Sequence, residues 1–123
     1  DRTVLQPLAQ HVWDTVTATY AAGAQPANEA LRPFGAGCGY SSCAVSRGIG
    51  VERVHEHSAT NVGCVGLAVL RSHGSCLDFP RLGLRVQQVD GDVIIFSAGT
   101  WHANSHVGGL RVTTAFYTVR RAR

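Results

Sequence analysis

The sequence predicts a mainly β, single-domain protein with one N-terminal α-helix, and three observations support this fold class. One amphipathic helical stretch opens the chain, and a connection rich in Gly, Pro and Ala follows it. From residue 40 onward, about eight short β-type runs follow one another with turn residues between them. No helical pattern separates these runs, and no internal repeat is present. Closely spaced strands after a single helix are typical of a β-sandwich or a small β-barrel.

The predicted helix covers residues 3–22. Its apolar residues recur at spacings of three and four, which forms one stripe along a helix. Pro7 is tolerated only near the first turn, and Gly23 is a natural stop. The stripe consists of Leu5, Leu8, Val12, Val16 and Tyr20.

The predicted β-region covers residues 40–119, after an irregular connection over residues 23–39. Asp90-Gly91 is a turn signal between two of its strands. We read Phe96 and Phe116 as core residues. The predicted strands are residues 41–46, 51–57, 62–70, 76–79, 84–89, 92–96, 102–107 and 111–119.

The composition is that of a globular domain and does not identify a partner. The 123 residues are 45% hydrophobic and 15% charged, with a net charge of +3. No apolar run is long enough to span a bilayer, and nothing in the sequence identifies a cellular compartment.

The sequence has no Met and begins at Asp1, so we expect a processed form or part of a longer chain. We expect residues 1–123 to form a single domain of that chain. The four cysteines lack zinc-finger spacing; a Cys38–Cys43 disulfide is one alternative.

The segment "VHEHSATN", residues 54–61, contains two histidines at the end of a predicted strand. Alternate side chains of a strand share a face, so His55 and His57 point the same way and Glu56 points the opposite way. A third histidine, His102, begins a later strand. Three neutral imidazoles suit Fe, Zn, Cu or Ni, so the pattern indicates a metal site.

A second candidate feature follows His102. Arg111 lies nine positions later, and Thr113 falls on the same face of the same predicted strand. A guanidinium fork beside a hydroxyl is suited to holding a small dicarboxylate. The alternative is an ordinary strand arginine paired with a surface acid.

In their order and spacing, these motifs resemble the double-stranded β-helix of Fe(II)/2-oxoglutarate dioxygenases, over about residues 40–119. The resemblance is greatest to the TET/JBP-like branch, which oxidises methylated bases. Its pattern is HxD, a distal His, and an Arg followed two positions later by Ser or Thr. The resemblance implies His55 and His102 as iron ligands and Arg111 with Thr113 as the 2-oxoglutarate clamp. It also implies a nucleic-acid partner, although no residue here reads a base.

The departure from that pattern is His57, which stands where the family has its carboxylate ligand. The substitution removes one negative charge from the metal site. Glu56 faces the other way in a regular strand and cannot replace it. The substitution therefore favours two readings: an atypical three-histidine site, or a catalytically inactive scaffold derived from the family, including a subunit of a larger assembly.

A second resemblance explains His57 better. Cupins share the barrel and have HxH followed by Glu, then a second motif that matches Gly91, Gly99 and His102. Asn61 stands at the Glu position. The cupin pattern keeps His55, His57 and His102 as metal ligands but does not account for Arg111 and Thr113. We therefore rank three functions. The first is a dioxygenase-like domain that uses Fe(II) and 2-oxoglutarate. The second is an inactive scaffold without metal, and the third is a cupin-type metalloprotein with another transition metal.

Overall fold

The N-terminal helix is the first element of the computed structural model, which describes residues 2–48, 61–105 and 109–119. Helix α1 spans Arg2–Thr19, with Pro7 in its second turn. Val12 and Val16 are completely buried, as the apolar stripe predicts, and so is Ala9, which the predicted stripe did not include. Tyr20 is 54% exposed, so its expected place on that stripe is wrong. The helix ends one residue before it, and the chain turns into a short 3-10 helix.

The remaining elements are two 3-10 helices and seven described strands. The strands fall into two antiparallel sheets, one with four strands and one with three. The 3-10 helices are Ala21–Gly23 and Glu29–Leu31, and the strands are β1 (Ser42–Gly48), β2 (Asn61–Arg71), β3 (Cys76–Phe79), β4 (Leu84–Gln87), β5 (Val93–Ser97), β6 (Ala103–Ser105) and β7 (Arg111–Val119).

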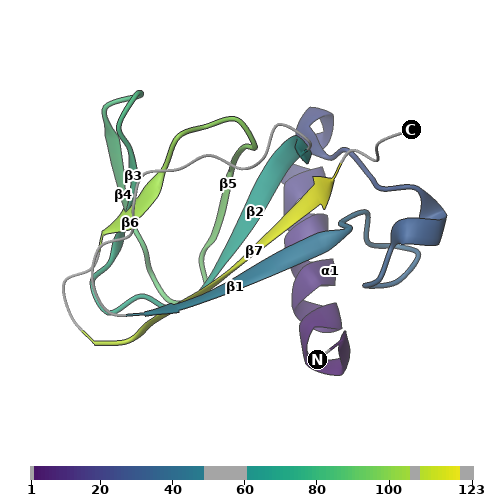
Figure 1. Cartoon of the computed structure of the whole chain (residues 1–123), viewed down its shortest axis with the longest axis horizontal. Helices are drawn as coiled ribbons and strands as arrows, with labels where there is room; N and C mark the ends of the chain where they lie inside the picture. The colour runs from purple at the N-terminus through teal and green to yellow at the C-terminus, as the bar shows by residue number, and fades with distance from the viewer. Residues whose placement is uncertain (1, 49–60, 106–108, 120–123) are drawn as a thin grey trace.

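The topology is that of a jelly-roll-like barrel. The order of the larger sheet is β1-β7-β2-β5, and that of the smaller sheet is β4-β3-β6. From β2 onward the chain passes from the larger sheet to the smaller, back through β5, across again to β6, and returns with β7. Figure 1 shows the smaller sheet at one end of the long strands and α1 at the other. The predicted mainly β fold with an N-terminal helix is therefore confirmed.

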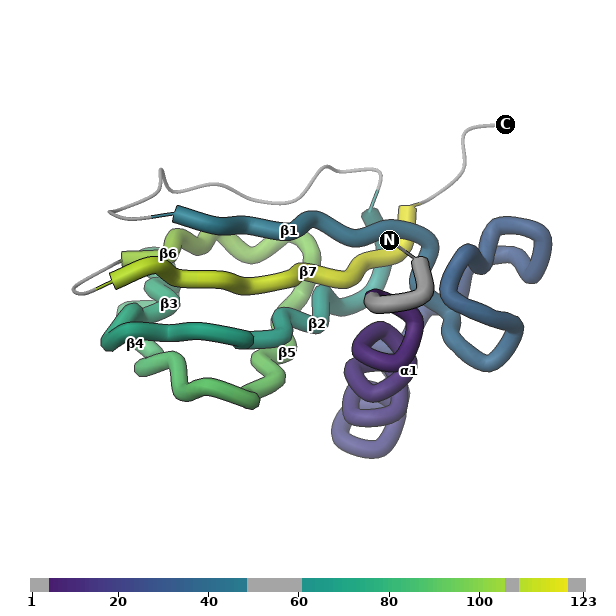
Figure 2. The backbone as a smooth tube through the Cα atoms, turned by 90° about the horizontal axis from the view of Figure 1, so that it is seen from below, coloured from purple at the N-terminus to yellow at the C-terminus, as the bar shows by residue number. Residues whose placement is uncertain are grey.

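The larger sheet has a different hydrophobic core on each of its faces. Figure 2 shows β1, β7 and β2 side by side, with α1 toward one end of them and the smaller sheet toward the other. On one face, residues of α1 pack on Phe116, Ala68 and Tyr40; we call this the helix-side core. On the other face, residues of both sheets meet; we call this space the barrel interior. Its apolar members are Val65, Leu67, Leu77, Phe79, Phe96 and Ala98. Phe96 and Phe116 are core residues, as predicted, although they belong to different cores.

Some sequence-based predictions are wrong in detail, and one falls on residues outside the described part of the chain. The predicted strand over residues 51–57 lies outside the described residues. The predicted strand over residues 84–89 ends at Gln87. All four cysteines are free, so the alternative of a Cys38–Cys43 disulfide is wrong. In the described part of the chain, no helix is long and apolar enough to cross a membrane.

Candidate functional site

His102 lies directly before β6, and its side chain is 4% exposed. Its Nδ1 lies 2.8 Å from the carbonyl oxygen of Thr100. A carbonyl can only accept a hydrogen bond, so Nδ1 donates to it, and in the neutral form of the ring the lone pair is on Nε2. Histidines that bind metals are held in this way by an oxygen acceptor on the other ring nitrogen. His102 therefore has the tautomer that a metal ligand needs.

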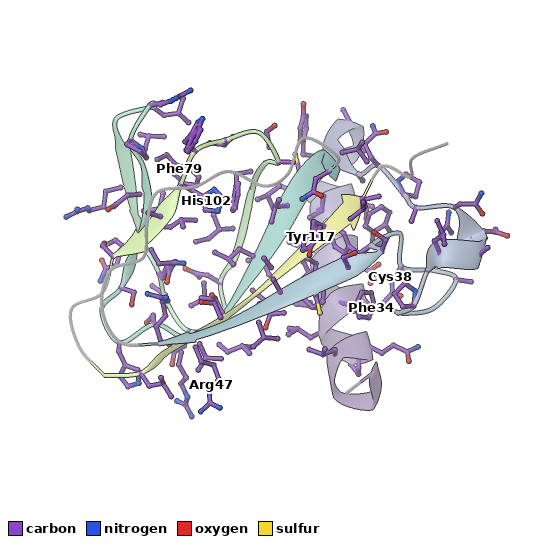
Figure 3. The ribbon with its side chains drawn as sticks, viewed as in Figure 1. Phe34, Cys38, Arg47, Phe79, His102 and Tyr117 are labelled. Carbon is purple, nitrogen blue, oxygen red and sulfur yellow. The ribbon has the colours of Figure 1, made fainter. Side chains whose placement is uncertain are left out.

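Two phenylalanines fix the position of the His102 ring in the barrel interior. The Phe96 ring centroid is 4.6 Å from that of His102, and the Phe79 centroid is 6.5 Å away. Phe96 belongs to β5 in the larger sheet and Phe79 to β3 in the smaller one. Figure 3 shows His102 beside Phe79, away from the helix-side residues Phe34 and Cys38. The imidazole thus lies between the two sheets, in mainly apolar surroundings.

Arg111 and Thr113 enter the same interior from β7. Along this strand, residues 111, 113, 115 and 117 share one face, and Ala115 and Tyr117 pack against the apolar interior core. Arg111 is 4% exposed and Thr113 is 1% exposed. The structure thus places both side chains on the shared face that the sequence predicted for them, and that face is the inner one.

Gln88 and Asn104 add a polar contact that sequence reasoning missed. Gln88 Nε2 donates to Asn104 Oδ1 over 2.6 Å, and both residues are at most 5% exposed. Asn104 pairs in register with Leu77, an interior residue, so it faces the interior as well. The spacing of Asn104 two residues after His102 on one strand was the available signal. No sequence pattern indicated Gln88.

Five of the eight buried polar residues in the described part of the chain face or border this interior. They come from both sheets and from the connections between strands. They are Gln88, His102, Asn104, Arg111 and Thr113. The barrel interior therefore has an apolar portion around Phe79 and Phe96 and a polar portion from β6, β7 and the segment after β4.

The other two histidines of the predicted metal site are His55 and His57. Both lie outside the described residues, and so does His106. Among residues 2–48, 61–105 and 109–119, no three His, Cys, Asp or Glu side chains form a group that could hold a metal. The three-histidine site stays a prediction, of which His102 is the described member.

An arginine–tryptophan contact lies next to His102 along the chain, and two buried thiols lie away from the barrel interior. Trp101 is partly buried, and the guanidinium of Arg81 lies over its ring, 4.8 Å from the centroid. Burial raises the pKa of the Cys38 and Cys64 thiols. Both thiols are therefore protonated at neutral pH, and neither is an activated nucleophile.

Comparison with known proteins yields structural similarity alone. No protein-family model matches the sequence, and no curated protein matches it. A crystal structure of a Neisseria meningitidis protein is similar over 62% of this chain and 72% of its own, with 13% identity and a TM-score of 0.49. A cupin 2 conserved barrel domain protein from Rhodopseudomonas palustris is similar over 66% of this chain, with 17% identity and a TM-score of 0.47. This match spans 55% of the second protein. Similarity at this level concerns the fold and assigns no activity.

Proposed function

We propose that the barrel interior is the site of an Fe(II)/2-oxoglutarate dioxygenase-like oxygenase. His55, His57 and His102 hold the metal in this proposal, and Arg111 with Thr113 holds the co-substrate. One observation carries the proposal: His102 and the Arg111–Thr113 pair are buried and reach the same interior from opposite sheets.

The chemistry of these side chains fits the groups that they would bind. The proton on Nδ1 of His102 leaves Nε2 as the ligand atom. The guanidinium of Arg111 presents parallel N–H donors to a carboxylate, and the Thr113 hydroxyl supplies one more. Phe79 and Phe96 keep the surroundings of His102 apolar, which strengthens electrostatic contacts made there. When bound, the iron would supply the activation of oxygen.

The absence of a carboxylate among the proposed ligands has a direct consequence. Three neutral imidazoles leave the full 2+ charge of the metal uncompensated by the protein. A dianionic co-substrate would then contribute more of the charge balance than in a site with an acidic ligand. We therefore expect metal and 2-oxoglutarate to bind with positive coupling, each raising the affinity for the other.

The proposal is tested first by metal binding under anaerobic conditions. Wild-type protein should take up close to one equivalent of Fe(II), or of Mn(II) as its oxygen-stable substitute. His102→Gln should weaken binding at least about 100-fold, since the loss of even an outer partner of a ligand costs about 10–100-fold. The matched control is His11→Gln, because His11 is exposed on α1 and should leave metal binding unchanged. Uptake below about a tenth of an equivalent by wild-type protein would favour the inactive scaffold.

A second variant tests the role of His57. His57→Asp restores the acidic ligand of the dioxygenase pattern and should strengthen Fe(II) binding. His11→Asp adds the same charge at the exposed helix position and serves as the control. Weaker binding by His57→Asp would show that imidazole is the selected ligand at this position.

The second candidate function is a cupin-type metalloprotein, and the HxH pair favours it. It predicts metal uptake that depends on His102 but does not respond to 2-oxoglutarate. Arg111→Gln would then leave metal affinity unchanged, with or without the dicarboxylate. The two candidates thus differ in one measurable quantity, the coupling between metal and co-substrate.

A further inference from the structure

We propose that a cleft between β4 and β5 binds a small amphipathic carboxylate, a molecule with a linear or flat apolar body and one anionic end. The cleft is separate from the polar portion of the barrel interior. Its existence does not depend on the metal site proposed above.

The cleft lies where the two sheets part. β4 ends the order of the smaller sheet and β5 ends that of the larger one, so among the described strands each is an edge. The space between them encloses about 370 Å³. Pockets of roughly 300 Å³ and above accommodate small ligands.

An inward-facing leucine shows that this side of the barrel is open. Leu84 pairs in register with Phe79, so both side chains point toward the larger sheet. Phe79 is 5% exposed, whereas Leu84 is 55% exposed. In a closed barrel an inward-facing residue at this position would be covered. Leu84 therefore marks the mouth of the cleft.

The walls and floor of the cleft are apolar. Leu82 and Val86 line it beside Leu84, and Ile94 lines it from β5. Leu82 is 62% exposed, so burying it and Leu84 under a ligand would remove considerable apolar surface from water. The floor is formed by Phe79 and Phe96, the two rings that contact His102.

The residues next to the cleft indicate the charge of the ligand. Ser97 and Thr100 are polar residues that line the cleft, and Trp101 and Arg81, which do not line it, are the chain neighbours of Thr100 and Leu82. The Arg81 guanidinium lies on the Trp101 ring, which limits its freedom. Within the described ranges, no carboxylate lies within ion-pairing distance of Arg81. An apolar cleft with a cation held next to its lining residues complements a molecule with an apolar tail and a carboxylate.

Octanoate is a suitable probe, and octan-1-ol is its neutral counterpart. Titration calorimetry with wild-type protein, in the presence of EDTA, should give a dissociation constant for octanoate below about 1 mM. Octanol should bind about fivefold more weakly, the scale of one exposed charge contact. Arg81→Gln should reduce octanoate affinity to that of octanol. An excess of 2-oxoglutarate should not displace octanoate, which separates this cleft from the proposed co-substrate site.

Leu84→Glu provides the decisive variant. It places a negative charge at the mouth of the cleft and should weaken octanoate binding at least tenfold. Leu70→Glu is the matched control, because Leu70 is a strand leucine that is 42% exposed and does not line the cleft. Equal binding by the two variants, or no octanoate binding by wild-type protein at 10 mM ligand, would overturn the proposal. Equal affinities for octanoate and octanol would overturn the role of Arg81.

Discussion

The two faces of the four-stranded sheet carry different chemistry. On the helix-side core, α1 packs on aromatic and aliphatic residues, with Tyr40 stacked on Phe116 at a centroid distance of 5.8 Å. In the barrel interior, a histidine, an arginine and two amides are buried among apolar side chains. The same strands carry both faces, because alternate residues of a strand point to opposite faces of the sheet. The two faces therefore differ in the residue types at these alternating positions.

This difference between the two faces supports the proposed location of the functional site. Burial of a polar group costs free energy unless it is compensated, and packing alone does not require it. The buried polar side chains that β7 places on the helix-side face are the small threonines Thr114 and Thr118, and we expect this face to contribute mainly to stability. The interior contains polar groups that the same fold does not need. We therefore expect substitutions on the two faces to affect different measurable quantities.

The largest expected effect is on the helix-side core. Phe116 is completely buried and contacts both Phe34 and Tyr40. Phe116→Ala should lower the free energy of unfolding by about 3–5 kcal/mol, because it leaves a cavity as well as losing burial. Urea denaturation measures this loss. Metal affinity of the folded fraction should stay unchanged; a proportionate fall would contradict the separation of the two faces.

Gly66 tests how closely α1 approaches the sheet. A Cβ at this position would lie 2.3 Å from Val12 Cγ1 and 2.7 Å from the Tyr40 hydroxyl oxygen. Gly66→Ala should therefore cost about 1–3 kcal/mol through overpacking. Gly48→Ala is the control in a strand with open space at the Cβ position. Equal stability of the two variants would show that the helix can move away without cost.

Adjacent threonines on β7 allow the sharpest comparison between the two faces. Thr113 faces the interior, whereas Thr114 faces the helix side; both are at most 1% exposed. Within the described part of the chain, the Thr114 hydroxyl has no hydrogen-bond partner. Thr114→Val should raise stability by about 1 kcal/mol and leave 2-oxoglutarate binding unchanged. Thr113→Val should weaken 2-oxoglutarate binding several-fold. Identical effects of the two substitutions would remove the distinction between the faces.

The smallest expected effect lies outside both faces, at Asp90. Its carboxylate accepts hydrogen bonds from the Ser72 backbone and hydroxyl groups, at 2.8 and 3.0 Å, and these bonds lower its pKa. A lowered folded-state pKa gives stability that is present above the unfolded-state pKa and is lost as pH falls through the folded-state value. Asp90→Ala should thus lose stability at pH 7 and show a flatter acid limb below about pH 4. Thermal melts from pH 2 to pH 7 measure both; parallel acid limbs would contradict this account.

The periodic patterns accounted for much of the fold. The spacing of three and four placed Val12 and Val16 of α1 correctly toward the core, since that spacing forms one stripe on any helix. Alternation along β7 placed Arg111 and Thr113 on one face. These features depend on local geometry, which a sequence carries directly.

The features that the sequence did not indicate depend on contacts between distant segments. Gln88 and Asn104 meet only because the chain returns to the smaller sheet through β6. Leu84 faces the larger sheet yet is exposed, because its strand has no neighbour on that side among the described strands. Tyr20 fits the helical stripe but follows the last helical residue. To predict such features, one would need to know which strands become neighbours and where each helix or strand ends.

The central claim is that the polar portion of the barrel interior binds a metal together with a dicarboxylate. The most direct test is the melting temperature of the Fe(II)-loaded, oxygen-free protein as 2-oxoglutarate is added. At about 100 times its dissociation constant, the ligand should stabilise the protein by about 2.7 kcal/mol, or about 10 °C. This rise should be absent without metal and absent in Arg111→Gln. An unchanged melting temperature in the metal-loaded wild-type protein would contradict the account.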